Sequence, residues 1–396
     1  MIRHQLPVFS PLPLRALIGS ALSRTQGAGS ALRDALRQGF GVEDALLCGS
    51  GTQALQLALQ ASRGAGRSRG EVVALPAFAC YDLASAAIGA DVQVGFYDID
   101  PDTLLPDMDS LTRVLAREPA AVVIAPLFGY QPDWDAIRSL ARRHDVGLIE
   151  DAAQSFGALW KGEPSGGIGD LSVLSFGRGK GWTAVEGGAL LGPERELVSL
   201  SESVALGRPG AKAASRILLQ GFAQWALGRP LFYGLPSAVP GLELGETVYH
   251  APVAPSFASP LSARLALQTL EISRREATAR RARAREMVAR IEAERNGGIR
   301  VPAAHGRSEP GNLRLPLLAS PAARRHLLAR GRVLGVMPSY PRPLPELPSL
   351  KPHIAEEATF PGARALAERL VTLPTHSLLT ESDMSRIVQL VRATDG

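Results

Sequence analysis

Short apolar runs alternate with stretches of helical period between about residues 40 and 192. This alternation is typical of βαβ units around a mostly parallel sheet. The pattern predicts seven strands, at Ala45–Cys48, Val72–Leu75, Val92–Tyr97, Ala121–Ala125, Val146–Ile149, Leu171–Phe176 and Gly188–Leu191. Helices are predicted between them, at Thr52–Ser62, Tyr81–Ile88, Asp109–Arg117 and Trp134–Arg143. Because ligands of such sheets gather at the carboxyl ends of the strands, we expect the chemistry there.

The chain changes character after about residue 245. Residues from Ser262 to about Arg295 contain neither Gly nor Pro and are rich in Ala, Leu, Arg and Glu, which predicts one long helix. A last helix is predicted at Glu381–Val391, with Thr380 as its N-cap. We therefore expect an α/β protein with a large domain over residues 1–245, which includes an apolar insertion at about 211–240. The bridging helix and a smaller C-terminal α/β domain would occupy residues 246–396.

Composition excludes several function classes. The net charge is +5, but the basic residues are spread along the chain without an aromatic-basic module, so we expect no nucleic-acid partner. Cys48 and Cys80 lie in no CxxC or Cys/His cluster, so we expect no metal site and take the cytoplasm as the default location. No apolar run approaches the roughly 18 residues of a membrane span, and Pro7, Pro11 and Pro13 interrupt the N-terminus, which argues against a signal peptide.

Two turns at strand ends carry candidate binding residues. One turn suggests an anion site, and the other carries a carboxylate that could pair with the ring nitrogen of a ligand. Gly49, Ser50, Gly51 and Thr52 follow a strand and open a helix, where free N–H groups and hydroxyls favour a phosphate. The alternative is an ordinary small-residue turn in which Thr52 only caps the helix. Asp151 ends another apolar run, where its carboxylate could pair with a protonated ring nitrogen or act as a helix cap.

A third turn carries a lysine. Lys180 lies between two glycines, five residues after Ser175, in a loop that follows an apolar strand. We expect neighbouring Arg178 to make this amine easier to deprotonate than a solvated lysine, as a Schiff base requires. A surface-loop lysine is the alternative. The chain holds only four lysines, Lys161, Lys180, Lys212 and Lys351, so any amine chemistry must draw on one of them.

Several motifs together carry a family resemblance. They are SGTQAL (Ser50–Leu55), Glu71–Asp100 with LPAF and GFYDIDPDT, LFGYQPDWDAI (Leu127–Ile137), IEDAAQSFGA (Ile149–Ala158), GGIGDLSVLSFGRGK (Gly166–Lys180), EGGALL (Glu186–Leu191) and LPTHSLLTESDMSRI (Leu373–Ile387). In order and spacing they resemble the DegT/DnrJ/EryC1/StrS family of sugar aminotransferases, which depend on pyridoxal 5′-phosphate (PLP). The resemblance covers roughly two-thirds of the chain and implies the type I PLP-transferase (aspartate-aminotransferase) fold, with a seven-stranded sheet in the large domain.

The resemblance also implies roles for individual residues. Lys180 would hold PLP as a Schiff base and act as nucleophile and general acid/base, and Asp151 would pair with the pyridine nitrogen. Gln154 would lie near the phenolic oxygen of PLP. The phosphate would be held by Ser50, Gly51, Thr52 and Ser175. The family further implies a homodimer that moves an amino group from an amino acid, such as glutamate or glutamine, to a keto group of a nucleotide-linked sugar in glycan or secondary-metabolite synthesis.

The sequence departs from the family at three places. Cys80 occupies the position of an aromatic residue that stacks on the PLP ring, and Tyr81 or Phe78 could replace it; we favour Tyr81. Gly181 follows the lysine where Asn is common. The run Gly-Tyr/Phe-Asn-Arg has no match, and the apolar segment Ala211–Pro240 lies in its place.

The apolar segment has two interpretations. Arg216, Gln220, Gln224, Arg229 and Pro230 interrupt it too often for a membrane span. We expect burial against a partner subunit or the small domain, with a contribution to the substrate entrance. The alternative is an interfacial helix that admits a lipid-linked acceptor.

Two other functions compete with the aminotransferase. A PLP-dependent sugar dehydratase or another PLP lyase is one, but the family's dehydratases replace the lysine by His, and Lys180 argues against it. A non-catalytic regulatory protein that retains the fold is the other.

Overall fold

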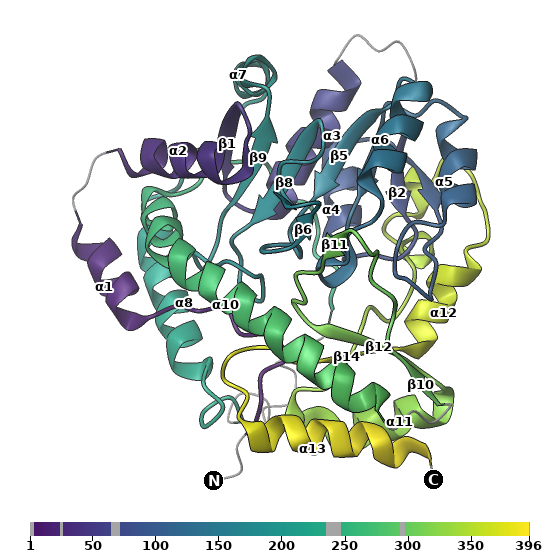
Figure 1. The fold of residues 1–396 in the computed structure, drawn as a ribbon. Coiled ribbons are helices and arrows are strands. Elements are labelled where there is room, and N and C mark those ends of the chain that lie inside the picture. The colour runs from purple at the N-terminus through teal and green to yellow at the C-terminus, as the bar shows by residue number, and fades with distance from the viewer. Residues whose placement is uncertain (1–3, 24–26, 65–71, 235–246, 294–297, 396) are drawn as a thin grey trace.

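The computed structural model describes residues 4–23, 27–64, 72–234, 247–293 and 298–395 (Figure 1). A seven-stranded sheet forms its centre, in the order β1-β9-β8-β5-β4-β2-β3. The strands are β1 (Asp44–Cys48), β2 (Val72–Pro76), β3 (Gln93–Tyr97), β4 (Ala121–Ile124), β5 (Gly147–Asp151), β8 (Leu171–Ser175) and β9 (Gly188–Gly192). Each begins and ends within two residues of its predicted bounds, which confirms the strand predictions.

The sheet is mostly parallel, as predicted. Strand β9 is the exception, because it pairs antiparallel with both β8 and β1. The connection from β8 to β9, residues 176–187, contains no helix, and a parallel crossover usually needs one. Since β5 and β8 pair in parallel and β1 runs in their direction, the carboxyl ends of these three strands share one edge of the sheet.

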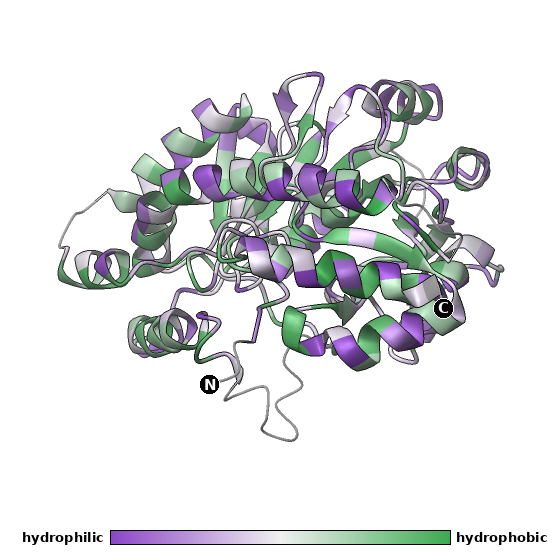
Figure 2. Cartoon of the chain, turned by 60° about the horizontal axis from the view of Figure 1, so that its bottom comes forward, coloured by the Kyte–Doolittle hydropathy of each residue, from purple (hydrophilic) through white to green (hydrophobic). Residues whose placement is uncertain are grey.

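The predicted helices are also present. They are α3 (Gly51–Gly64), α4 (Asp82–Ala90), α5 (Met108–Leu115) and α6 (Trp134–Arg143). Helices α1 (Leu14–Leu22), α2 (Ala28–Phe40), α7 (Glu194–Ser203) and α8 (Ala213–Leu227) complete this part. The helices alternate polar and apolar residues, whereas the central strands are mainly apolar (Figure 2). No helix in the described ranges is both long enough and apolar enough to cross a membrane.

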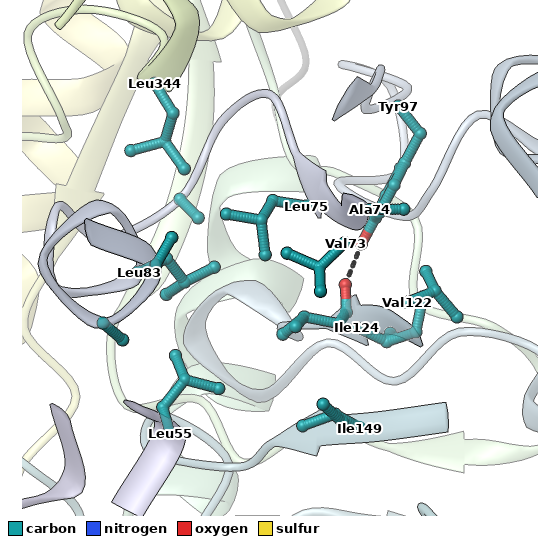
Figure 3. Packing of buried hydrophobic residues seen from close by; sticks show 14 of the residues in the cluster. Leu55, Val73, Ala74, Leu75, Leu83, Tyr97, Val122, Ile124, Ile149 and Leu344 are labelled. Atoms are coloured by element: carbon teal, nitrogen blue, oxygen red, sulfur yellow. Dashed lines mark hydrogen bonds between the residues drawn. The ribbon is translucent and has the colours of Figure 1, made fainter. Parts of the chain in front are cut away.

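The main core lies between the sheet and its helices. Leu55 of α3, Leu83 of α4 and the strand residues Val73 and Ile149 pack there, and Tyr97 donates a hydrogen bond from its buried hydroxyl to the Val123 carbonyl at 2.8 Å (Figure 3). Leu344, from far along the sequence, packs in the same cluster (Figure 3). The C-terminal part of the chain therefore helps to close the core of the large sheet.

The long helix α10 (Pro260–Glu292) follows, capped by the Ser259 hydroxyl. It begins two residues before the predicted helix, and the last predicted residues, 294 and 295, lie outside the described ranges. It packs on α1 and α2 and also on α13 (Glu381–Arg392). Thr380 caps α13 as predicted and forms a capping box with Asp383.

A second, antiparallel sheet stands beside α10 (Figure 1). Its order is β10-β12-β14-β13, and its strands are β10 (Ile299–Arg300), β12 (Leu315–Ala319), β13 (Met337–Pro338) and β14 (Leu370–Leu373). Helices α11 (Pro321–Gly331) and α12 (Pro361–Arg369) complete the unit. Three short strands, β6 (Leu159–Trp160), β7 (Glu163–Pro164) and β11 (Ser308–Glu309), form a third sheet.

Only one face of α8 is covered by the described chain. Ile217 and Gly221 are buried, and Gly221 packs so closely on α1 that a Cβ there would lie 2.5 Å from Leu17 Cδ2. Leu219 and Phe222, on the other side of α8, are 73% and 53% exposed. Within one chain, α8 is therefore buried on its inner face, against α1. Burial against a partner subunit or the small domain stays a prediction, and residues 235–240 of the segment lie outside the described ranges.

Candidate active site

The predicted anion-binding turn lies where β1 meets α3. Ser50 Oγ accepts a hydrogen bond from the Gln53 amide at 3.1 Å, so Ser50 is the N-cap of α3 and the alternative of a Thr52 cap is wrong. A Cβ at Gly51 would lie only 2.6 Å from Ser175 Cβ, which shows that the helix start and the end of β8 are in direct contact. The first amides of a helix lack partners and carry positive partial charge. This turn, with the hydroxyls of Ser50, Thr52 and Ser175, fits a phosphate group.

Asp151 is the last residue of β5 and is buried, with 9% of its surface exposed. Its Oδ1 accepts a hydrogen bond from the Ala153 amide at 3.0 Å, and the following residues form turns and no helix, so the alternative role as a helix cap is wrong. Burial raises the pKa of Asp151, and the positive charge of Lys180 acts against this shift. A buried carboxylate of this kind gains from a cationic partner, so Asp151 fits a protonated ring nitrogen.

Lys180 is half-buried in the loop from β8 to β9, and distant parts of the chain hold this loop. The Lys180 carbonyl accepts a hydrogen bond from Ser10 Oγ at 2.7 Å, and Trp182 Nε1 donates to the Ala266 carbonyl of α10 at 3.0 Å. A Cβ at Gly181 would lie 2.9 Å from Phe156 Cβ, which explains the glycine where the family often has Asn. Lys180 is therefore not a freely solvated surface-loop lysine.

Electrostatics at Lys180 differ from the sequence prediction. Burial favours the neutral amine, but the side chains of Cys80, Asp82 and Asp151 together act more strongly and raise the pKa of Lys180. The largest cationic influence that opposes them is Arg314, and the prediction that Lys180 is easier to deprotonate than a solvated lysine is wrong. The surrounding charges therefore favour the protonated amine.

Gln154 links the large sheet to the C-terminal region. Its Nε2 donates to the Tyr340 hydroxyl at 2.5 Å, and its Oε1 accepts from the Phe128 amide at 3.2 Å. The Tyr340 ring also packs against Phe78, with centroids 5.4 Å apart. Burial raises the pKa of Tyr340 well above its usual range, so its hydroxyl stays protonated at neutral pH.

The predicted stacking residue points toward the C-terminal region. Tyr81 is buried, and its hydroxyl exchanges hydrogen bonds with the backbone of Arg342, at 3.2 and 3.3 Å. Cys80, at the family's aromatic position, donates its thiol hydrogen to Asp82 Oδ2 at 3.3 Å. Burial raises the pKa of Cys80 to about 12, so it is a neutral thiol. The stacking role of Tyr81 stays a prediction.

Sequence reasoning missed three residues of the candidate site: Asp82 and Arg314, which influence Lys180, and Tyr340, which contacts Gln154. Arg314 precedes β12, and its Nη1 donates to Thr372 Oγ1 at 3.5 Å. No acid of the described ranges lies within 4 Å of its guanidinium, and burial lowers the pKa of Arg314. A signal was available for Arg314, because it is the one charged residue in the apolar run Leu313–Ala319. Nothing in the sequence marks Asp82 or Tyr340.

The fold defines the class of the protein: it is the type I fold of PLP-dependent aminotransferases. The sugar aminotransferase CalS13 from Micromonospora echinospora matches it with a TM-score of 0.74 at 21% identity, over 99% of this chain and 100% of that one. Solved structures of the same fold include a PLP-form and a PMP-form. The model of the DegT/DnrJ/EryC1/StrS aminotransferase family matches residues 20–216, and the chain belongs to this family.

Curated relatives match a shorter part of the chain. The L-glutamine:2-deoxy-scyllo-inosose aminotransferase of Streptomyces paromomycinus is 33% identical over 156 residues, 39% of this chain and 36% of that protein. The GDP-perosamine synthase of Caulobacter vibrioides is 33% identical over 159 residues, 40% of this chain and 42% of that protein. The chain thus spans less than half the length of these relatives.

Proposed function

We propose that the chain is a PLP-dependent aminotransferase that moves an amino group from an amino acid to a keto group of a nucleotide-linked sugar or related polyol. One observation carries the proposal: an anion-binding turn, a buried carboxylate and a half-buried lysine lie at the ends of β1, β5 and β8, along one edge of the sheet. The named relatives, which aminate an inosose or make GDP-perosamine, support the sugar acceptor.

Each residue would have a defined task. Ser50, Gly51, Thr52 and Ser175 would hold the phosphate of PLP, and Asp151 would keep a proton on the pyridine nitrogen. Bound PLP supplies an electron-withdrawing ring that makes the substrate α-proton acidic. The Nζ of Lys180 would attach the cofactor and then, once displaced by the substrate amine, move that proton.

Arg314 extends the proposal to the amino donor. It is half-buried, without an acid partner in the described ranges, and coupled electrostatically to Lys180. Arg binds carboxylates through two parallel hydrogen bonds. Arg314 would therefore bind a carboxylate of the donor, such as glutamate or glutamine.

Three further parts of the hypothesis concern the whole protein. We expect a cytoplasmic homodimer, as the family resemblance implies, and a fully active monomer in light scattering would contradict it.

The division into two domains at residue 245 also stays a prediction. A separate apolar cluster within residues 287–391 supports it, although the Gln5 amide donates to the Val333 carbonyl, which places the N-terminal segment against the C-terminal unit.

Borohydride trapping tests the proposal directly. Reduction of the PLP-loaded protein should fix a pyridoxyl group on Lys180, and peptide mass spectrometry would locate it among the four lysines. Lys161→Arg is the matched control, because Lys161 is paired with Asp135 on the surface and its loss should leave the label unchanged. A label on Lys161, Lys212 or Lys351 would overturn the assignment.

Release of a keto acid from the donor distinguishes an aminotransferase from a dehydratase. Absence of any adduct after borohydride reduction would favour a regulatory protein.

A further inference from the structure

Exposed apolar side chains gather on two neighbouring helices, α1 and α8. The helices contact each other at one side of the molecule, away from the C-terminal sheet (Figure 1). Among the described residues, twelve large hydrophobic side chains are exposed, and seven of them lie on α1, on α8 or just after α8. These seven, which we call the apolar face, are Ile18, Leu22, Leu219, Phe222, Leu227, Leu231 and Phe232. Leu22 and Leu219 are the most exposed, at 77% and 73%.

Both segments that carry the apolar face lack acidic residues. No Asp or Glu occurs in residues 1–33 or 203–242. At the average of the whole chain, 38 acidic residues in 396, these two stretches together would contain about seven. Exposed basic residues accompany the apolar ones, namely Arg15 on α1, Lys212 just before α8, Arg216 on α8 and Arg229 after it. Arg216 pairs with Glu186 at 2.9 Å. No acid of the described ranges lies within 4 Å of the other three.

A second copy of the chain fits this surface poorly. In a two-fold dimer through the apolar face, the same patch meets itself. Arg15, Lys212 and Arg229 would then face their own copies with no acid of the described ranges beside them, which costs free energy in a partly desolvated contact. An anionic lipid surface offers both complements at once, because its headgroups pair with Arg and Lys and its acyl region accepts Leu and Phe.

The local geometry matches an interfacial helix. Helix α8 has 15 residues, fewer than the roughly 20 needed to span a bilayer, so it could only lie flat. The Arg229 guanidinium stands 4.5 Å from the Trp225 ring centroid, and Trp225 also contacts Phe222. Aromatic rings beside cations are typical of membrane–water interfaces.

We infer that α1 and α8 together form a docking surface for an anionic lipid membrane, with the apolar face inserted and the basic residues at the headgroups. The candidate active site lies close to this docking surface. Gln224 Nε2 of α8 donates a hydrogen bond at 3.4 Å to Thr183 Oγ1, which belongs to the loop that carries Lys180. Docking does not depend on the proposed reaction, so the two can fail separately.

Vesicle sedimentation tests the inference with the full chain. Protein is mixed with phosphatidylcholine vesicles that contain or lack phosphatidylglycerol, at low and high salt, and the bound fraction is measured. We expect binding to the anionic vesicles that falls at least about fivefold at high salt, where charge interactions are screened. The variant Leu219→Ser/Phe222→Ser should lose most of this binding. The matched control is Val198→Ser/Val253→Ser, which removes two exposed apolar side chains elsewhere, 44% and 66% exposed, and should bind like the wild type.

A charge variant separates docking from misfolding. Arg15→Glu/Lys212→Glu keeps the apolar face and should lose the preference for anionic vesicles, while its melting temperature stays that of the wild type because both side chains are exposed. Equal binding of wild type and both variants, or no binding of the wild type to anionic vesicles, would overturn the inference. Conversion of a dimer into monomers by Leu219→Ser/Phe222→Ser, seen by light scattering, would assign the face to a second copy instead.

Discussion

Replacing Gly51 by Ala tests the contact on which the phosphate site depends. The added Cβ would lie 2.6 Å from Ser175 Cβ, 2.9 Å from its Oγ and 3.2 Å from its Cα. Carbon atoms in contact normally stand about 3.5–4 Å apart, so α3 and β8 must separate by about 1 Å. Gly51 does not have a positive φ. The effect of the substitution is therefore steric and involves no backbone strain.

The magnitude follows from the forced separation. Overpacking of this kind costs about 1–3 kcal/mol of stability. A displacement of about 1 Å at a positioned site can cost on the order of a hundredfold in function, so we expect the PLP dissociation constant to rise about ten- to a hundredfold. Thermal unfolding of the cofactor-free protein measures the first effect, and titration of PLP absorbance measures the second.

Two further variants make the test specific. Gly177→Ala is the matched control, because its Cβ would lie 3.6 Å from the same Ser175 Oγ, an ordinary contact, and should change little. Gly51→Ala/Ser175→Gly should recover part of the lost stability, since the contact between the two Cβ atoms disappears. If Gly51→Ala binds PLP and unfolds like the wild type, the close contact of α3 with β8, or its role in the phosphate site, is refuted.

The remaining predictions concern single side chains. Asp151→Asn should retain part of its affinity for PLP but slow α-proton removal in the donor half-reaction at least about a hundredfold, because an amide cannot hold the ring nitrogen protonated; unchanged rates would rule out its role. Glu150→Gln should lower the free energy of unfolding by about 3 kcal/mol, since this buried carboxylate accepts hydrogen bonds from Ser165, Gly166, Ile168 and Ser172 at 2.6–2.9 Å, and denaturant titration would show it. Burial lowers the pKa of His376 from 6.5 to about 4, so the unfolded chain binds a proton first as the pH falls. The free energy of unfolding should then drop between pH 6.5 and 4 by about 1.4 kcal/mol per unit from this group. His376→Gln should flatten that part of the curve, and an identical slope would contradict the buried neutral imidazole.

The sequence predicted the strands well because they are buried on both faces. Runs such as Ala121–Ile124 are apolar without interruption, and this signal does not depend on distant residues. The two-residue strands β6, β7 and β11 carry no such pattern and could not be predicted. The N-cap residue of α3 could not be predicted from the sequence either, because Ser50 and Thr52 both carry a suitable hydroxyl. Only the geometry of the folded chain selects Ser50.

The positions of candidate site residues that follow a single strand could be predicted from the sequence. Asp151 ends β5 and Lys180 lies in the loop after β8, as the motifs indicated, and their roles stay a prediction. Tyr340 was not predictable, since it reaches Gln154 across 186 positions of sequence through the packing of the C-terminal region. The charge at Lys180 was predicted wrongly for the same reason: sequence proximity suggested Arg178, whereas folding brings Cys80, Asp82 and Arg314 close.

The anchoring of the lysine loop has a consequence for how the protein is made. Ser10 holds the Lys180 carbonyl from 170 residues upstream, and Trp182 is held by Ala266 and Thr269 of α10, more than 80 residues downstream. A chain still on the ribosome therefore lacks a fixed Lys180 loop until α10 has emerged and docked. PLP added to such a nascent chain meets a mobile lysine, and chains truncated before residue 260 should bind the cofactor poorly even though the strands that carry Asp151 and Ser175 are already complete.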